Sequence, residues 1–266
     1  MISLFKNLLN LLLNPFDLEI TKLTALKKLL ADRAAGARAK ADLDFLLTVE
    51  NQHTEKLIKL LHKSKSQFRQ DLFVLSQLDF KPNGYFVEFG ATNGIDLSNT
   101  HLLEKEFSWI GILAEPANCW HSTLHQNRTA HIDTDCVWST SNSTLIFNES
   151  EIPDLSTISA FCDADHHSKL RVSGKSYEVK TISLNDLLEK YNAPAQIDYL
   201  SIDTEGSEFE ILSHFDFSKY TFRVITCEHN FTPMREKIFD LLTANEYNRV
   251  HQDISGVDDW YIRQIG

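Results

Sequence analysis

From residue 66 onwards, short apolar runs alternate with segments of helical periodicity. After a helix at 66–78, strands are expected at 85–90, 109–116, 130–138, 197–206 and 222–230. Helices are expected between them at 100–107, 119–127, 183–191 and 209–215, and after them at 233–245, while 141–180 is less regular. Such alternation is typical of a mostly parallel sheet with helices on its faces. The pattern predicts an α/β fold with a Rossmann-like, doubly wound sheet.

The two ends of the chain differ from this pattern. The runs 247–253 and 258–265 predict an antiparallel C-terminal hairpin at a sheet edge. Residues 1–62 are almost entirely helical in pattern, so we expect an N-terminal helical arm at 1–62 and a second domain at 63–266. The first stretch, MISLFKNLLNLLLNPF, indicates an amphipathic helix. It would pack on its own domain or on a second copy of the chain, with peripheral membrane attachment as the alternative.

Charge and cysteine content limit the partners and the compartment. The 266-residue chain has a formal net charge of −11, and a nucleic-acid partner would need a basic surface. We therefore expect no nucleic acid. The four cysteines form no CxxC pair, a pattern that favours reduced thiols in the cytoplasm. No run is long and apolar enough to span a bilayer.

Acidic residues stand where the expected strands end. The ends read Glu88 before the Gly90–Gly94 turn, Glu115-Pro116, Asp133 to Cys136, Asp203-Thr204-Glu205-Gly206 and Glu228-His229-Asn230. In open parallel sheets, ligands bind at the carboxyl ends of the strands. The sequence therefore predicts an acidic binding site along one edge of the sheet.

The glycine turn narrows the choice of ligand. Thr92 replaces the middle glycine of G-x-G-x-x-G, so a dinucleotide pyrophosphate fits poorly. Glu115 is placed to accept hydrogen bonds from a ribose diol. Glu88 would repel phosphate but suits an ammonium or sulfonium group, as in S-adenosylmethionine. The alternative is that Glu88 is a helix-capping carboxylate near a tight turn.

Two stretches, YFVEFGATNGIDLSNTHLLEKEFSWIGILAEP and IDYLSIDTEGSEFEIL, resemble the FkbM-type family of S-adenosylmethionine-dependent methyltransferases. The resemblance runs from SQFRQDLFVL to the C-terminus and leaves out the helical arm. Its most specific part is D-x-E-G-x-E, at Asp203, Glu205, Gly206 and Glu208. It implies the class I methyltransferase fold and O-methylation of a sugar or small-molecule hydroxyl.

The resemblance also implies roles for individual residues. Glu88, Gly90, Ala91 and Gly94 would hold the methionine moiety, Glu115 the ribose, and Pro116 would shape the adenosine site. Asp135 and Cys136 lie where the adenine would bind, and Asp203 would lie beside the sulfonium. Gln70 and Asp71 would close over the cofactor, and Asn99 and Thr100 would contact its carboxylate. Helix capping is the alternative for these last four residues.

Transfer to a hydroxyl needs the removal of a proton, which favours a general base. The candidate bases are Asp203, Glu205, Glu228 and His229. His229 is the first choice because it titrates near neutral pH, Asp203 is the second, and a structural role is the alternative for His229. Asp203, Glu228 and Asn230 also offer oxygen ligands for Mg²⁺ or another divalent cation.

The sequence leaves one segment and two alternative functions undecided. The segment CDADHH at 162–167 is either a ligand cluster or a solvated, acceptor-facing loop. A non-catalytic interaction protein with this fold and a nicotinamide-dependent oxidoreductase are the alternative functions. Both alternatives predict little or no binding of S-adenosylmethionine.

Overall fold

The computed structural model describes residues 28, 36, 38–162 and 168–264. The chain divides into two compact units, Met1–Leu47 and Thr48–Gly266. Residues 38–47 of the first unit are helical, and α2 (Asn51–Leu60) belongs to the second unit. The predicted N-terminal amphipathic helix and residues 163–167 of CDADHH lie outside the described residues, and the boundary at residue 62 stays a prediction. Within the described residues, no helix has both the length and the apolar character needed to cross a membrane.

The main sheet of the second unit has seven strands among the described residues. Their order is β10 (Tyr247–Val250), β11 (Asp258–Arg263), β9 (Thr221–Glu228), β8 (Gln196–Ile202), β1 (Tyr85–Phe89), β2 (Ile110–Ala114) and β3 (His131–Asp133). The five strands from β9 to β3 are parallel, and β11 runs antiparallel to both β9 and β10. The predicted doubly wound sheet and its antiparallel C-terminal hairpin are confirmed. The chain winds outward in both directions from β1, which makes the β1–β8 pair the switch point of the topology.

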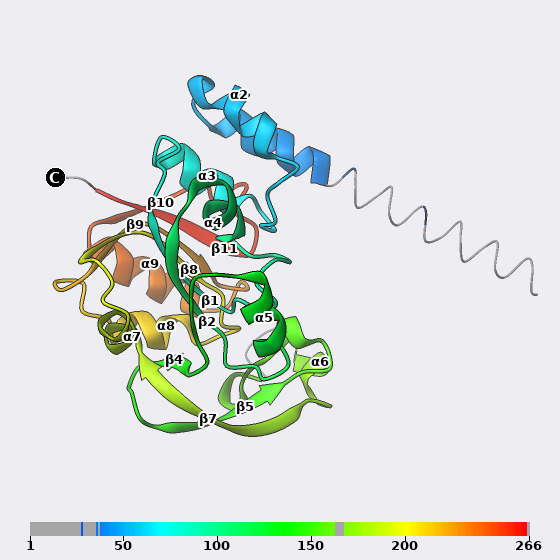
Figure 1. The fold of residues 1–266 in the computed structure, drawn as a ribbon, viewed down its shortest axis with the longest axis vertical. Helices are drawn as coiled ribbons and strands as arrows, with labels where there is room; N and C mark the ends of the chain where they lie inside the picture. The colour runs from blue at the N-terminus through cyan, green and yellow to red at the C-terminus, as the bar shows by residue number, and fades with distance from the viewer. Residues whose placement is uncertain (1–27, 29–35, 37, 163–167, 265–266) are drawn as a thin grey trace, which may run out of the picture. The chain divides into compact units, whose positions relative to one another are not determined.

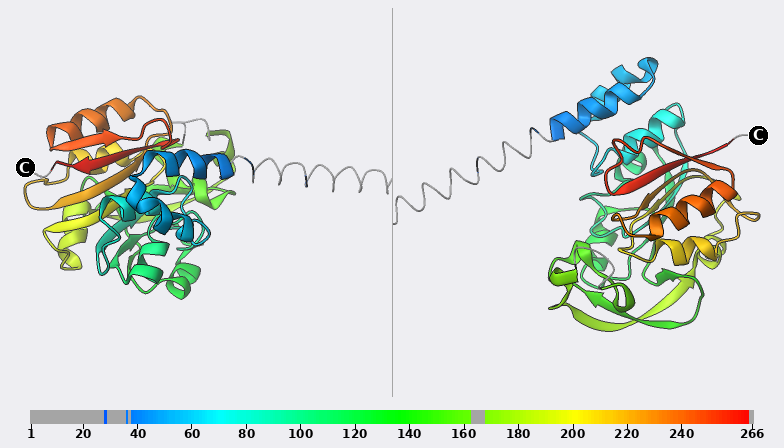
Figure 2. Two further views of the ribbon diagram at one scale, coloured as in Figure 1. Left: turned by 90° about the horizontal axis from the view of Figure 1, so that it is seen from above. Right: turned by 180° about the vertical axis from the view of Figure 1, so that it is seen from behind.

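Helices cover both faces of this sheet. They are α3 (Gln70–Gln77), α4 (His101–Phe107), α5 (His121–Asn127), α7 (Leu184–Lys190), α8 (Glu208–Ser213) and α9 (Met234–Ala244). Figures 1 and 2 show strand β11, in red, between α3 in cyan and α9 in orange. The central strands β1 and β8 are buried on both faces, and their side chains Val87 and Leu200 are fully buried in one apolar core. Burial of each such side chain contributes about 1.5–3 kcal/mol.

The strand expected at 130–138 is instead two strands in two sheets. Asp133 Oδ1 accepts the Asp135 N–H at 3.0 Å, and the chain turns there between β3 and β4 (Cys136–Trp138). Strand β4 begins a four-stranded sheet with the order β4, β7 (Lys175–Ser183), β5 (Thr144–Glu149) and β6 (Thr157–Ile158). The less regular stretch 141–180 thus contains two strands and part of a third, together with η1 (Pro153–Leu155), η2 (Ser159–Phe161) and α6 (Ser168–Arg171). Figure 1 shows this second sheet far from β10 and close to α5.

Candidate active site

A pocket of about 460 Å³ opens at the carboxyl ends of β1, β2, β8 and β9. Ten residues predicted from the sequence line it: Glu88, Gly90, Asn99, Glu115, Pro116, Cys136, Asp203, Glu205, Glu228 and Asn230. The second sheet contributes another wall, which includes Phe147, Ile158 and residues 152–156. The pocket therefore lies at the switch point of the main sheet, where open α/β folds bind their ligands.

The turn after β1 brings its backbone close to the end of β8. Gly90 has a φ of +72°, and a Cβ atom at this position would lie 2.0 Å from the backbone oxygen of Asp203. Only glycine fits this approach. Thr92, which replaces the middle glycine of the dinucleotide motif, also takes a positive φ of 46°. The turn is therefore tight although it lacks the middle glycine of the dinucleotide motif. The poor fit of a pyrophosphate stays a prediction from the sequence.

Glu88 lines the pocket, but its carboxylate is already bonded within the protein. It accepts the Asn99 N–H at 2.6 Å, the Thr100 hydroxyl at 2.5 Å and the Ser98 hydroxyl at 3.0 Å. The Arg128 guanidinium lies 3.6 Å away. Glu88 therefore holds the turn that precedes α4. Glu88 thus has a role within the protein in addition to lining the pocket, and its predicted contact with a cationic ligand stays a prediction.

Arg128 organises the same region, and the sequence reasoning did not identify it. Its side chain is fully buried, and Nε donates to Glu104 Oε2 at 2.8 Å. Its Nη1 donates to the Gly94 carbonyl at 3.1 Å, and its Nη2 donates to the Thr100 hydroxyl at 2.8 Å. Because two carboxylates and a backbone carbonyl share this one guanidinium, the glycine turn and the start of α4 are fixed together. A lone arginine after α5 carries no sequence signal for this role.

Glu115 is the buried carboxylate at the end of β2. Its Oε2 accepts the Thr92 N–H and its Oε1 accepts the Ala117 N–H, both at 2.8 Å. Burial raises the pKa of Glu115 to about 7, partly offset by these hydrogen bonds and reinforced by the charge of Asp203. Each oxygen keeps a further lone pair, so Glu115 can still accept two hydroxyl donors from the pocket that it lines.

Six predicted cofactor residues do not line the pocket. Ala91 is buried, and Gly94 packs on the Leu124 and Arg128 side chains. Thr100 donates to Glu88, and Gln70 Nε2 donates to Asp258 Oδ2 at 2.7 Å. Asp135 lies in the β3–β4 turn, whereas its neighbour Cys136 reaches the pocket. Asp71 Oδ1 accepts the Ser64 hydroxyl at 2.7 Å. The predicted contacts of these six residues with the cofactor stay predictions.

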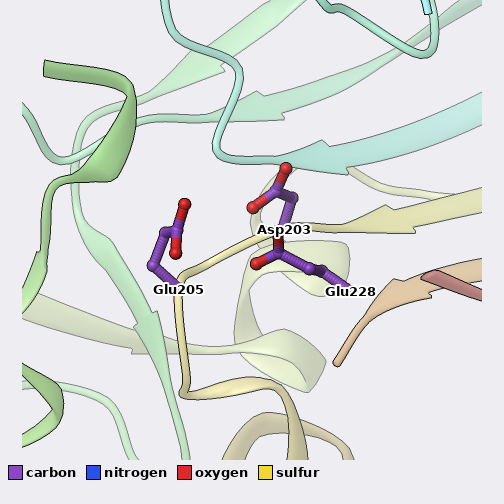
Figure 3. A group of neighbouring side chains, drawn as sticks. All are labelled: Asp203, Glu205 and Glu228. Atoms are coloured by element: carbon purple, nitrogen blue, oxygen red, sulfur yellow. The ribbon is translucent and has the colours of Figure 1, made fainter. Parts of the chain in front are cut away.

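Three carboxylates meet at one side of the pocket. The nearest oxygen atoms of Asp203, Glu205 and Glu228 all lie within 4.8 Å of one another. Figure 3 shows the three side chains turned toward a common space from two neighbouring strand ends. Asp203 is open to the pocket although protein surrounds it closely. Removal from bulk water and the nearby carboxylates raise the pKa of both Asp203 and Glu228, so the pair holds a shared proton more tightly than exposed carboxyls do.

Glu205 differs from the other two because a buried arginine neutralises it. Arg171 Nη2 lies 2.7 Å from Glu205 Oε2, and the Arg171 guanidinium also bonds the Leu155 carbonyl through Nε at 2.7 Å. Asn230 Nδ2 donates to the same Glu205 oxygen at 3.2 Å. Asn230, predicted as a metal ligand, is therefore committed to Glu205 through its amide nitrogen.

His229, the first choice for the general base, does not line the pocket. Its Nδ1 accepts the Phe231 N–H at 3.0 Å, and its Nε2 lies 3.7 Å from Asp259 Oδ1. Burial lowers the pKa of His229, although the nearby Asp259 carboxylate acts in the opposite direction. Because Glu228 faces the pocket, the next side chain in the extended chain points to the other face. These contacts match the structural alternative for His229, and its role as the general base stays a prediction.

The pocket walls fit S-adenosylmethionine. Among the described residues, the buried Oδ1 of Asn99 has no hydrogen-bond partner, and its Nδ2 donates to the Ser201 hydroxyl at 2.9 Å. Such an oxygen suits an ammonium donor, and the Glu115 carboxylate suits ribose hydroxyls. Pro116, Cys136 and Val137 add an apolar wall of the kind that a flat base packs against.

Comparison with known proteins agrees with this arrangement. The family model of the methyltransferase FkbM domain matches residues 88–253. A search of curated proteins finds no significant match. Among solved structures, an FkbM methyltransferase from Methylobacillus flagellatus KT is similar at 11% identity and a TM-score of 0.43, covering 85% of this chain and 59% of that chain.

Two other similar structures are a precorrin-6y C5,15-methyltransferase from Geobacter metallireducens GS-15 and a putative RNA methyltransferase from Pyrococcus horikoshii. The first has 10% identity, a TM-score of 0.38 and coverage of 72% of this chain and 85% of the other. The second has 11% identity, a TM-score of 0.38 and coverage of 74% and 82%.

The match at 88–253 covers more than half of the 266 residues and contains the glycine turn, Glu115, the D-x-E-G-x-E motif and the end of β9. The strand order of the main sheet is that of a class I methyltransferase. The chain therefore belongs to the FkbM methyltransferase family.

Proposed function

We propose that this protein is a cytoplasmic S-adenosylmethionine-dependent O-methyltransferase whose acceptor is a hydroxyl of a sugar, a glycan or a glycosylated natural product. The FkbM methyltransferase domain and the class I fold imply S-adenosylmethionine as the donor. When bound, this cofactor supplies a methyl group carried on a positively charged sulfur. The acceptor class is what the resemblance to the FkbM-type family implies, and the carboxylates of the pocket are chemically suited to a hydroxyl acceptor.

The carboxylate pair Asp203–Glu228 is the observation that carries the proposal. A hydroxyl is a poor nucleophile until its proton is removed, and a base works best when its pKa lies near the operating pH. Removal from bulk water raises the pKa of both carboxyls. The charge of Asp203 adds to the rise at Glu228, whereas the hydrogen bond with Glu228 acts in the opposite direction at Asp203. One member of the pair can therefore accept the hydroxyl proton while the other remains beside it to stabilise the acid form through a hydrogen bond.

The remaining polar groups have positioning roles in this proposal. Glu115 accepts the ribose hydroxyls, and Asn99 Oδ1 accepts from the ammonium group. Glu205, paired with Arg171, adds a carboxylate whose position is fixed and whose charge is balanced by that arginine. Because methyl transfer is an in-line displacement, much of the rate enhancement comes from holding the acceptor oxygen at the correct place relative to the methyl group.

A divalent cation is the second part of the proposal. The three carboxylates of Asp203, Glu205 and Glu228 offer hard oxygen ligands of the type that Mg²⁺ prefers, and their nearest oxygens lie within 4.8 Å of one another. A cation there would replace the shared proton and would lower the pKa of a bound hydroxyl directly. Glu205 joins the predicted ligands because its carboxylate belongs to this group. Asn230 donates to Glu205 through its amide nitrogen, so its Oδ1 is not used by that bond.

The test is transfer of radiolabelled methyl groups from S-adenosylmethionine to a panel of glycosides and cell glycans, with and without chelator. We expect transfer to at least one glycoside. Glu228→Gln should lower kcat by a factor of about 10²–10⁴, the usual contribution of a general base. Glu178→Gln, which removes an exposed carboxylate on β7, is the matched control and should leave kcat unchanged.

Each alternative has its own outcome in this experiment. Activity that disappears with chelator and returns with Mg²⁺ favours the mechanism with a divalent cation. Activity that chelator does not change favours the mechanism in which a carboxylate is the base. His229→Asn should leave the pH dependence of kcat unchanged, because the ring lies outside the pocket. Failure to bind S-adenosylmethionine in a calorimetric titration would contradict the proposal and favour a non-catalytic or a nicotinamide-binding protein.

A further inference from the structure

The chain makes a constrained turn directly after the catalytic end of β9. Asn230 and Phe231 both take a positive φ, of 44° and 54°. His229 and Asn230 donate their N–H groups to the Val257 carbonyl at 2.8 and 3.3 Å, and the Thr232 N–H donates to the His229 carbonyl at 2.8 Å. Residues other than glycine rarely adopt a positive φ, and residues that do so often lie at ligand sites.

This turn holds an aromatic ring out in solvent. Phe231 is 67% exposed, although it follows the pocket residue Asn230. Its N–H donates to His229 Nδ1 at 3.0 Å, and the two rings meet edge to face with their centroids 5.1 Å apart. The buried His229 thus holds the backbone of Phe231 and contacts one side of its ring, while the rest of the ring is exposed to solvent. An exposed, immobilised aromatic side chain beside a pocket indicates a binding surface.

Other apolar side chains stand at the same pocket. Leu97, which is 53% exposed, and Ile152, which is 44% exposed, both line it. The pocket therefore combines exposed apolar groups with the carboxylates of Asp203 and Glu228. A pyranose ring has the matching chemistry, because its faces carry C–H groups and its edge carries hydroxyl donors. The negatively charged face of an aromatic ring attracts such C–H groups.

We propose that Phe231 is the acceptor platform of this enzyme: a pyranose ring packs on Phe231 and thereby directs one hydroxyl toward the Asp203–Glu228 pair. His229 is a positioning residue that holds the platform through its bond to the Phe231 N–H. The inference rests on the proposed function and adds to it the residue that selects a cyclic sugar over an acyclic alcohol.

The test uses the full-length protein, tritiated S-adenosylmethionine and methyl glycosides of glucose, galactose, mannose, rhamnose and fucose. For the glycoside that the wild-type protein methylates best, Phe231→Ala should raise KM about tenfold, in line with the loss of one aromatic contact, and should change kcat less. The Kd for S-adenosylmethionine should stay unchanged. Because Phe231 is exposed, the melting temperature should also stay close to that of the wild type.

Replacement variants separate an aromatic platform from plain apolar contact. Phe231→Tyr and Phe231→Trp should keep a KM near the wild-type value, whereas Phe231→Leu should behave like Phe231→Ala. The matched control is Ile110→Ala, which removes a side chain that is 65% exposed at the opposite end of the sheet strands, and it should leave KM unchanged. His229→Asn should raise KM without moving the pH profile of kcat.

Two failures are distinguishable. If the wild-type protein methylates no glycoside, the proposed function is wrong in its acceptor class. If it methylates a glycoside but Phe231→Ala or Phe231→Leu keeps the wild-type KM, only the platform assignment is overturned.

Discussion

Arg171 and Glu205 form a buried ion pair between α6 and the segment that follows β8. Arg171 Nη2 lies 2.7 Å from Glu205 Oε2, and both side chains are almost inaccessible to solvent. The same guanidinium donates through Nε to the Leu155 carbonyl of η1, which lines the pocket. One cation therefore ties the wall supplied by the second sheet to the acidic side of the pocket.

Arg171→Met should destabilise the protein because it leaves the Glu205 carboxylate buried without its cation. Loss of one partner from a buried pair costs about 3–5 kcal/mol in the free energy of unfolding. Urea unfolding near pH 8 measures this cost. The double variant Arg171→Met/Glu205→Met should recover at least half of it, because no charge is then left unpaired. A double variant as unstable as Arg171→Met would contradict this account of the pair.

Glu115→Gln should weaken the binding of S-adenosylmethionine by about 10- to 100-fold, since hydrogen bonds from ribose hydroxyls to a charged carboxylate contribute about 1.5–3 kcal/mol. In the wild-type protein, binding should also strengthen as pH rises through about 7, because burial raises the pKa of Glu115 to about 7 and the ionised form is the better acceptor. Calorimetry near pH 6 and near pH 8 measures both effects. Equal affinities at the two pH values would argue against ribose contact by Glu115.

The pair Asp203–Glu228 predicts an acid limb in the rate profile. A general base must be ionised, so kcat should fall as pH drops and the pair takes up its first proton. In Asp203→Asn, the repulsion from one neighbouring carboxylate is removed, which lowers the pKa of Glu228 toward its ordinary range. The residual activity of Asp203→Asn should therefore extend to lower pH than that of the wild type. A profile that moves in the opposite direction would place the base elsewhere.

Asp258 should make the protein less stable as pH rises. Its Oδ2 accepts the Gln70 amide at 2.7 Å, and burial raises its pKa to about 8, partly offset by this hydrogen bond. The unfolded chain has a pKa of about 3.9 at this position, so between these two values the folded state binds more protons and loses stability as pH increases.

Asp258→Asn keeps an oxygen acceptor for Gln70 and never ionises. Near pH 8 it should stabilise the cofactor-free protein by at least about 1 kcal/mol, a rise of about 2–4 °C in Tm, with a clearly smaller effect near pH 5. Thermal unfolding at both pH values measures this, with Asp240→Asn, an exposed position on α9, as the control. Equal shifts at the two pH values would show that the charge of Asp258 is not the cause.

Much of the site could be predicted because parallel strands align their carboxyl ends. Glu115, Asp203 and Glu228 each follow an apolar run, and any parallel arrangement of those runs brings them to one edge. The position of His229 outside the pocket lining also has a simple origin. Glu228 and His229 are neighbours in an extended segment, where successive side chains point to opposite faces, so only one of them can face the pocket.

Other features depend on contacts between residues far apart in the chain. Arg128 joins Glu104 and the Gly94 carbonyl, and Arg171 joins Glu205 and the Leu155 carbonyl. Neither arginine stands in a motif or at a strand end. At the split of 130–138 into β3 and β4, the Asp135 N–H bonds Asp133 Oδ1, and pairing with β2 ends at Asp133.

The sequence by itself determined the sheet, its antiparallel edge and the line of acids, because these follow from local periodicity and from the polarity of strand ends. The tertiary structure decided how those acids are used. It committed Glu88 to the turn before α4, paired Glu205 with Arg171, turned His229 away from the pocket and left Asp203 beside Glu228. A carboxylate's role depends on which donors and charges surround it, and packing brings those neighbours from distant parts of the chain.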